Sequence, residues 1–167
     1  MTPAEIGLAR RIVACGLPVP TVGVDDDGIT VKWDTVPPDD SGFFSRQWMC
    51  EPEIGDTVRP FGIAPSAGIL FVCVATDAGP ELLPALDDYA LLGWLITELE
   101  RVTKSGCDIF EVTEAPLDMV AVLLGTSTTK IGKTVCWSVS TGGPDCHDGD
   151  TRIEALVAAL EAAKAAK

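Results

Sequence analysis

The feature that most constrains this chain is a set of three amphipathic segments, each bounded by residues that begin or end helices. In the first, Thr2 is a good N-cap, Pro3 occupies the first helical position and Glu5 completes a capping box. Gly16 follows the last apolar residue of the pattern, as is common where a helix ends. These signals predict a helix over residues 3–15.

The same reasoning predicts two further helices. One covers residues 88–104, where leucines recur at helical spacing and Asp87 is the expected N-cap. The other runs from residue 152 to the C-terminus, and Thr151 and Glu154 form a second capping box at its start. The helices therefore lie at the beginning, the middle and the end of the chain.

Strand patterns fill the intervals between the helices. Residues 21–24 and 29–33 flank an Asp-rich turn that ends in Gly28, which predicts a β-hairpin. Residues 68–75 are almost continuously apolar, as in a central strand, and we expect the helix over 88–104 to cover it. Further strands are expected at residues 107–112 and 134–140, and residues 119–124 fit either a strand or a short helix that begins at Pro116.

This order of elements predicts a single α+β domain over residues 1–167, with an antiparallel sheet and about three helices packed mainly on one face. One long irregular segment, residues 34–65, is rich in proline, glycine and acidic residues. Connections of this length are usually functional or contain an unrecognised strand. We take its aromatic residues Phe43, Phe44 and Trp48 as candidate binding residues, because the other tryptophans fall on expected core positions.

Charge and composition exclude several classes of partner. The chain carries 25 acidic and 12 basic residues, for a net charge of −13, which argues against binding to nucleic acid or to an anionic membrane surface. The apolar runs are too short to cross a bilayer, and no secretory signal is expected. The six cysteines are scattered singly without a CxxC pair, so we expect reduced thiols in a cytoplasmic protein.

The most chemically loaded segment is residues 142–150, which holds the single histidine of the chain. Two functional interpretations are possible. Cys146 and His147, with Cys136 or Asp150, provide the sulfur, nitrogen and oxygen ligands that suit zinc, or Cys146 acts as a nucleophile beside a helix N-terminus. Neither interpretation has diagnostic spacing, and we favour a polar turn that caps the last helix. We therefore expect no cofactor, and the balance is against an enzyme.

Three segments together are similar to a known group of proteins. They are residues 1–15 (MTPAEIGLARRIVAC), 86–102 (LDDYALLGWLITELERV) and 150–163 (DTRIEALVAALEAA). These segments resemble small uncharacterised proteins of tailed bacteriophages and prophages from GC-rich bacteria. The resemblance brings no activity or catalytic residue with it, and it implies only a phage accessory protein in a bacterial cytoplasm.

The sequence therefore favours a non-enzymatic phage accessory protein that binds a host protein. A metal- or thiol-dependent enzyme centred on Cys146 and His147 is one alternative. An acidic inhibitor that mimics DNA is another, although the acids occur in short clusters rather than in a continuous track. The oligomeric state is not fixed by any of these patterns.

Overall fold

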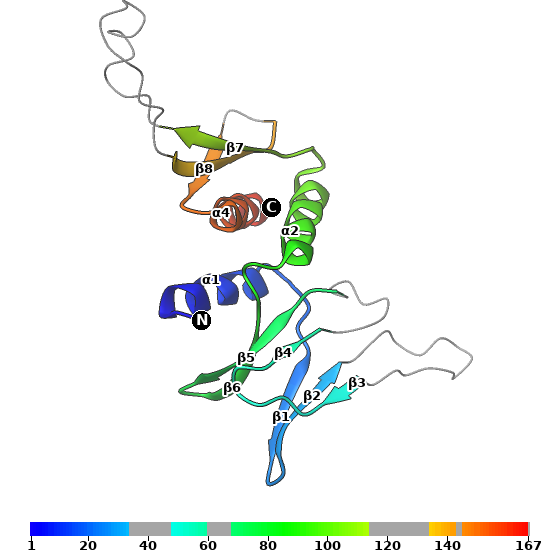
Figure 1. Ribbon diagram of the computed structural model, residues 1–167. Coiled ribbons are helices and arrows are strands. Elements are labelled where there is room, and N and C mark those ends of the chain that lie inside the picture. The colour runs from blue at the N-terminus through cyan, green and yellow to red at the C-terminus, as the bar shows by residue number, and fades with distance from the viewer. Residues whose placement is uncertain (34–47, 60–67, 114–133, 143–144, 167) are drawn as a thin grey trace, which may run out of the picture. The chain divides into compact units, whose positions relative to one another are not determined.

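A computed structural model describes residues 1–33, 48–59, 68–113, 134–142 and 145–166 of the chain (Figure 1). The predicted α+β class is confirmed, and every described strand pair is antiparallel. The described strands form three sheets of three strands each, where the sequence predicts one sheet. The chain divides into two compact units, Met1–Trp94 and Leu95–Lys167, and each is described here by itself.

The described part of the first unit contains helix α1 (Pro3–Ala14), the start of a second helix, and two of the three sheets. Its strands are β1 (Thr21–Asp25), β2 (Gly28–Trp33), β3 (Trp48–Cys50), β4 (Thr57–Val58), β5 (Phe71–Thr76) and β6 (Gly79–Pro84). The sheets have the orders β1-β2-β3 and β4-β5-β6, so the predicted hairpin and the predicted central strand, now β5, are both confirmed. Strands β3 and β4 lie within the segment 34–65 that the sequence pattern leaves irregular.

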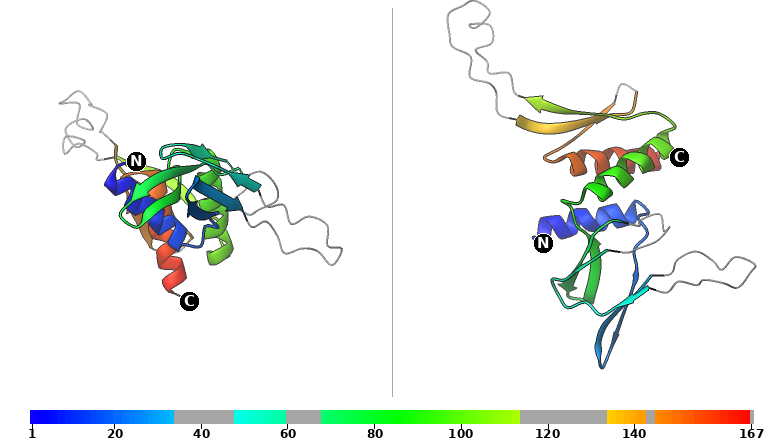
Figure 2. Two further views of the ribbon diagram at one scale, coloured as in Figure 1. Left: turned by 90° about the horizontal axis from the view of Figure 1, so that it is seen from below. Right: turned by 45° about the vertical axis from the view of Figure 1, so that its right-hand side comes forward.

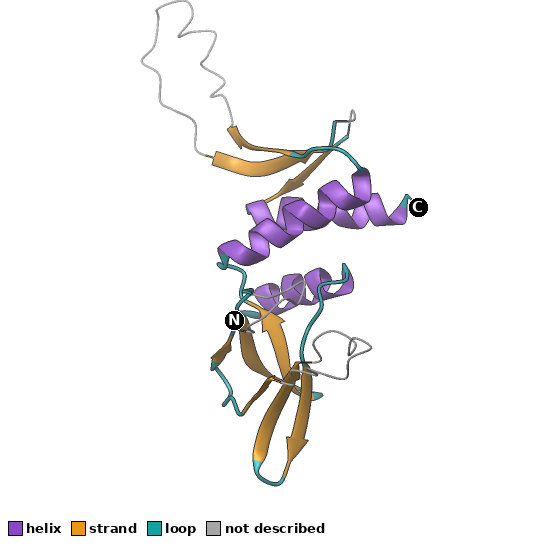
Figure 3. Ribbon diagram, turned by 90° about the vertical axis from the view of Figure 1, so that its right-hand side faces the viewer, coloured by secondary structure: helices purple, strands orange, loops and turns teal. Residues whose placement is uncertain are grey.

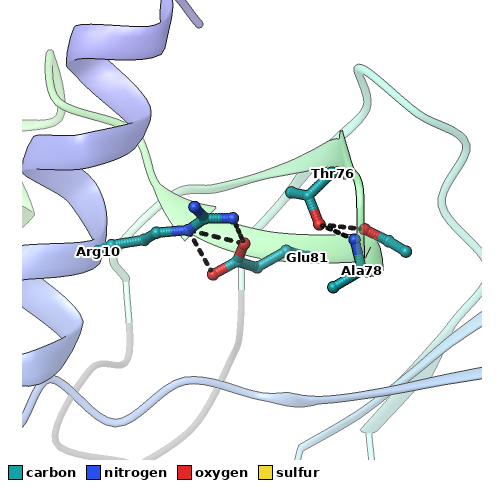
Figure 4. Close-up of polar contacts among 5 residues, drawn as sticks. Arg10, Thr76, Ala78 and Glu81 are labelled. Carbon is teal, nitrogen blue, oxygen red and sulfur yellow. Dashed lines mark hydrogen bonds and ion pairs between the residues drawn. The ribbon is translucent and has the colours of Figure 1, made fainter.

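One core cluster of the first unit lies between α1 and the β5–β6 hairpin. Ala9 of α1 is fully buried in one cluster with Val74 of β5 and Leu83 of β6. The guanidinium of Arg10, on the same helix, donates hydrogen bonds to the carboxylate of Glu81 on β6, the shortest at 2.7 Å (Figure 4). The sequence predicts the helix over 88–104 as the cover of β5, whereas the described core places α1 on this hairpin.

The sequence pattern does not reveal strand β6, which pairs with β5 and contributes to the cluster with α1. Pro80 and Pro84 lie within β6, and proline is tolerated only at the edge of a sheet, which is where β6 lies.

The turn from β5 to β6 is tight. The hydroxyl of Thr76 accepts from the backbone N–H of Ala78 and donates to the carbonyl of Gly79, whose positive φ of 114° favours glycine (Figure 4).

The second unit contains one sheet and the C-terminal helix. Its strands are β7 (Asp108–Thr113), β8 (Thr134–Ser140) and β9 (Cys146–Gly149), in the order β7-β8-β9. Helix α4 (Arg152–Ala165) follows, and α2 (Tyr89–Thr103) runs across the boundary of the two units. Both predicted capping boxes, at the starts of α1 and α4, are confirmed. The strand or short helix expected over 119–124 lies outside the described residues.

Strand β9 replaces the polar turn that the sequence favours between residues 142 and 150. Its residues, Cys146–Gly149, lack the apolar alternation by which strands are recognised, and only pairing with β8 identifies them. The strand leads almost directly into α4. A side chain at Gly149 would lie 2.4 Å from the backbone nitrogen of Ala155, so glycine is required for this close approach.

Helix α4 lies along one face of the β7-β8-β9 sheet, as two views show (Figures 2 and 3). Its buried residues are Ile153, Ala155, Leu156, Val157, Ala159 and Leu160. Among the parts of this unit that the structure describes, no helix or strand lies over the opposite face of the sheet (Figures 1 and 3). The sheet therefore has one covered face and one open face.

Candidate functional site

The strand register decides which side chains lie on each face of the β7-β8-β9 sheet. Successive side chains of a strand point to opposite faces, and directly paired residues share a face. Val139 is fully buried, and its partners on the neighbouring strands are Ile109 and His147. Gly149, which approaches α4, pairs with Trp137 and so lies on the same face as these residues. This is the face that α4 covers.

The remaining residues of the sheet form its open face, which we call the Phe110 face. Its members on β7, β8 and β9 are Asp108, Phe110, Val112, Cys136, Ser138, Ser140, Cys146 and Asp148. Phe110, Ser138 and Asp148 form one row across the three strands, because Ser138 pairs with both of the others. The next row contains Asp108, Ser140 and Cys146.

The Phe110 face has small residues on its central strand. The central strand contributes the small residues Ser138 and Ser140, while the outer strands contribute larger ones. Neighbouring strands lie about 4.8 Å apart, so the Cα atoms of Phe110 and Asp148 are separated by about 10 Å across Ser138. Phe110 is 43% exposed, although phenylalanine is among the residue types that are most often buried. The face thus carries an aromatic ring on β7 and a carboxylate on β9, on either side of Ser138.

Ser138, between Phe110 and Asp148 on this face, is a buried polar residue. It is only 2% exposed, and its hydroxyl has no hydrogen-bond partner among the described residues. A hydroxyl withdrawn from water without a partner costs about 1–3 kcal/mol. Such a group is a position where a ligand gains binding energy, because the ligand supplies the missing partner.

The charge on this face has one sign. Asp108 and Asp148 are both exposed, and the described members of the face include no lysine or arginine. Among the described members of the face, neither carboxylate has a cation beside it. An aromatic ring flanked by carboxylates is suited to a cationic ligand, which interacts favourably with both kinds of group.

The residues proposed for a zinc site are not brought together. Cys146 and His147 are adjacent on β9, so their side chains lie on opposite faces of the sheet. Cys136 shares the face of Cys146, but it lies four residues along β8 from Ser140, the partner of Cys146, a distance of about 13 Å. Asp150 follows the strand and is exposed. In the described ranges, no group of three His, Cys, Asp or Glu residues is placed to hold a metal ion.

The proposed nucleophile, Cys146, is exposed on the Phe110 face. Helix α4 lies on the other face of the sheet (Figure 3), whereas the strand register places the thiol of Cys146 on the Phe110 face. His147 is half-buried on the face that α4 covers. The electrostatic arrangement expected for a helix-activated cysteine is therefore not formed by the described residues around Cys146.

The aromatic candidates from the long segment are placed only in part. Trp48 begins β3 and is paired with Trp33 of β2, so its backbone belongs to the first sheet. Phe43 and Phe44 lie outside the described residues. That these three residues take part in binding remains a prediction.

Phe110 is the residue that the sequence interpretation missed, although a signal was present. Ile109 and Phe110 are consecutive, and two adjacent residues of a strand cannot both face the core. With Val112 two positions beyond Phe110, an apolar set must lie on each face of β7. The pattern alone leaves open which face the helix covers, and the register with Val139 of β8 resolves this.

Comparisons with known proteins add no relative to this description. The chain matches no protein-family model, no curated protein and no solved structure at a significant level. Among the described residues, no helix has both the length and the apolar character that a membrane span requires.

Proposed function

We propose that this chain is a non-enzymatic protein that acts by binding another protein, and that the Phe110 face is its contact surface. The biological setting proposed is that of a phage accessory protein bound to a host protein in a bacterial cytoplasm. The resemblance of the three helical segments to phage-encoded proteins supports that setting.

The observation that carries the proposal is the exposure of Phe110 on an open sheet face. Aromatic residues are enriched in protein–protein interfaces, and a few buried aromatic anchors supply much of the binding energy. A phenylalanine that is 43% exposed on a sheet face keeps apolar surface in water. Covering that ring with a partner removes its surface from water, which favours association.

The proposal is tested by affinity capture with matched variants. Phe110→Thr removes the ring but keeps a residue that favours strands, and Val24→Thr is the control. Val24 is the better exposed of the two, at 65%, and it lies in the first unit on β1. We expect one host protein to be retained at a fixed molar ratio by the wild type and by Val24→Thr, and at least tenfold less by Phe110→Thr.

Two results contradict the proposal. One is capture that is equally strong with Phe110→Thr, which places the contact elsewhere. The other is a failure to retain any protein in a fixed molar ratio. Circular dichroism melts of both variants establish that a loss of capture is not a loss of folding.

A further inference from the structure

The row formed by Phe110, Ser138 and Asp148 has the chemistry of an arginine-binding site. A guanidinium stacks on an aromatic ring through its flat face, and it donates hydrogen bonds from its edge. Phe110 supplies the ring, and Asp148 supplies the carboxylate on the other side of Ser138. The hydroxyl of Ser138, which lacks a partner among the described residues, supplies a further acceptor between them.

From this arrangement we propose that the Phe110 face binds an arginine side chain carried by an extended segment of the partner protein. The inference rests on the proposed function, because it names the chemistry of the partner for the same surface. The guanidinium lies over Ser138, stacked against Phe110 and paired with Asp148.

The second unit already contains an interaction of this kind. The guanidinium carbon of Arg152 lies 4.2 Å from the centre of the Trp137 ring, on the face that α4 covers. Cation–π contacts of this type are more common for arginine than for lysine. The open face carries a ring and carboxylates without the arginine, so the cation is supplied by the partner.

The second row indicates why the partner segment is extended. Asp108 lies two residues from Phe110 along β7, a distance of about 7 Å. In an extended peptide, residues i and i+2 point to the same side with about the same spacing. A segment with the pattern Arg-X-Arg therefore directs one guanidinium to Phe110 and Asp148 and places the other near Asp108.

Nucleic acid does not fit this surface. Its phosphates would lie against Asp108 and Asp148 with no lysine or arginine among the described members of the face. A lysine of the partner can pair with the carboxylates, but it lacks the planar guanidinium that stacks on an aromatic ring and donates paired hydrogen bonds to a carboxylate at the same time. The site is therefore expected to distinguish arginine from lysine at equal charge.

The test uses two synthetic peptides with the full-length protein. Their sequences are Gly-Thr-Arg-Thr-Arg-Thr-Gly and the same peptide with lysine in place of both arginines. Binding is measured by fluorescence anisotropy, and NMR locates the contact on β7 and β9. We expect the arginine peptide to bind at least tenfold more tightly, and we expect Phe110→Thr and Asp148→Asn each to weaken it about tenfold.

The control variant is Asp26→Asn, which removes one exposed carboxylate from the β1–β2 turn of the first unit. It changes the net charge by the same amount as Asp148→Asn, and we expect it to leave binding unchanged. Equal affinity for the two peptides, or an equal loss with Asp26→Asn, would show that the chain attracts cations only through its overall charge, and would overturn the inference.

The two proposals fail separately. Capture of a host protein that depends on Phe110, together with no preference for arginine, retains the function and rejects the arginine site. An arginine preference that depends on Phe110 and Asp148, together with no captured protein, retains the site and rejects the function.

Discussion

At the start of α2, a contact with a residue distant in the sequence decides whether Asp87 or Asp88 caps the helix. The sequence predicts Asp87 as the N-cap of the middle helix, but the carboxylate of Asp88 accepts the backbone N–H of Ala90 at 3.2 Å. It also accepts the N–H of Leu70 at 2.5 Å, and its side chain is only 9% exposed. The two acids are equivalent in the local pattern, and the contact with Leu70 distinguishes them.

Replacing Asp88 by Ala is therefore expected to lower the free energy of unfolding by about 1–3 kcal/mol, because two backbone donors lose their acceptor. Replacing the exposed Asp87 by Ala is the matched control and should change it by less than about 0.5 kcal/mol. Urea unfolding of the three proteins measures both values. A larger decrease in the free energy of unfolding for Asp87→Ala than for Asp88→Ala would show that Asp87 is the N-cap, as the sequence predicts.

At the scale of elements, Glu98 connects α2 to α4 within the second unit. Its carboxylate accepts from the Nε of Arg101 at 2.7 Å and from the Nζ of Lys164 at 2.9 Å, and its side chain is 13% exposed. The hydrogen bond from Arg101 is the largest cause that lowers the pKa of Glu98 to about 2, and Lys164 adds to it. The helices are thus joined by a charged contact that depends on pH.

The sign of that dependence follows from the lowered pKa. The contact stabilises the folded chain fully above about pH 4.5, and its contribution is lost as the pH falls towards 2. We expect Glu98→Gln to reduce the free energy of unfolding by about 1–3 kcal/mol at pH 6, and the difference from wild type to shrink steadily below pH 4.5. Glu100→Gln, at an exposed position of the same helix, is the control. A Glu98→Gln effect that is constant between pH 6 and pH 3 would contradict this account.

The elements that the sequence predicts are those whose signals are local. The capping boxes at Thr2 and Thr151 require only four consecutive residues, and both helices begin where these boxes place them. Strands β6 and β9 were missed because prolines interrupt one and polar residues fill the other. The candidate site was missed for a related reason, since the row through Ser138 exists only once β7, β8 and β9 are paired.

At the scale of the whole molecule, the grouping of strands depends on pairing between distant segments. Strand β3 pairs with β2 across residues 34–47, and β4 pairs with β5 across residues 60–67. No local pattern specifies which strands join into one sheet, so the sequence predicts the α+β class but not the three separate sheets. The assignment of the chain to two compact units depends on the same distant contacts.

The net charge of −13 acts on the molecule as a whole, and its effect on stability is measurable. Excess charge of one sign destabilises a compact chain through self-repulsion, and salt reduces the range of that repulsion to about 10 Å at 0.1 M. We expect the melting temperature at pH 7 to rise by about 2–4 °C between 20 and 300 mM NaCl, as a gain of about 1 kcal/mol would produce. The variant Asp26→Lys/Asp27→Lys, changed at two exposed turn residues, should respond less to salt because its charge excess is smaller. A melting temperature that falls as salt is added would mean that screened ion pairs, such as Arg10 with Glu81, outweigh the repulsion.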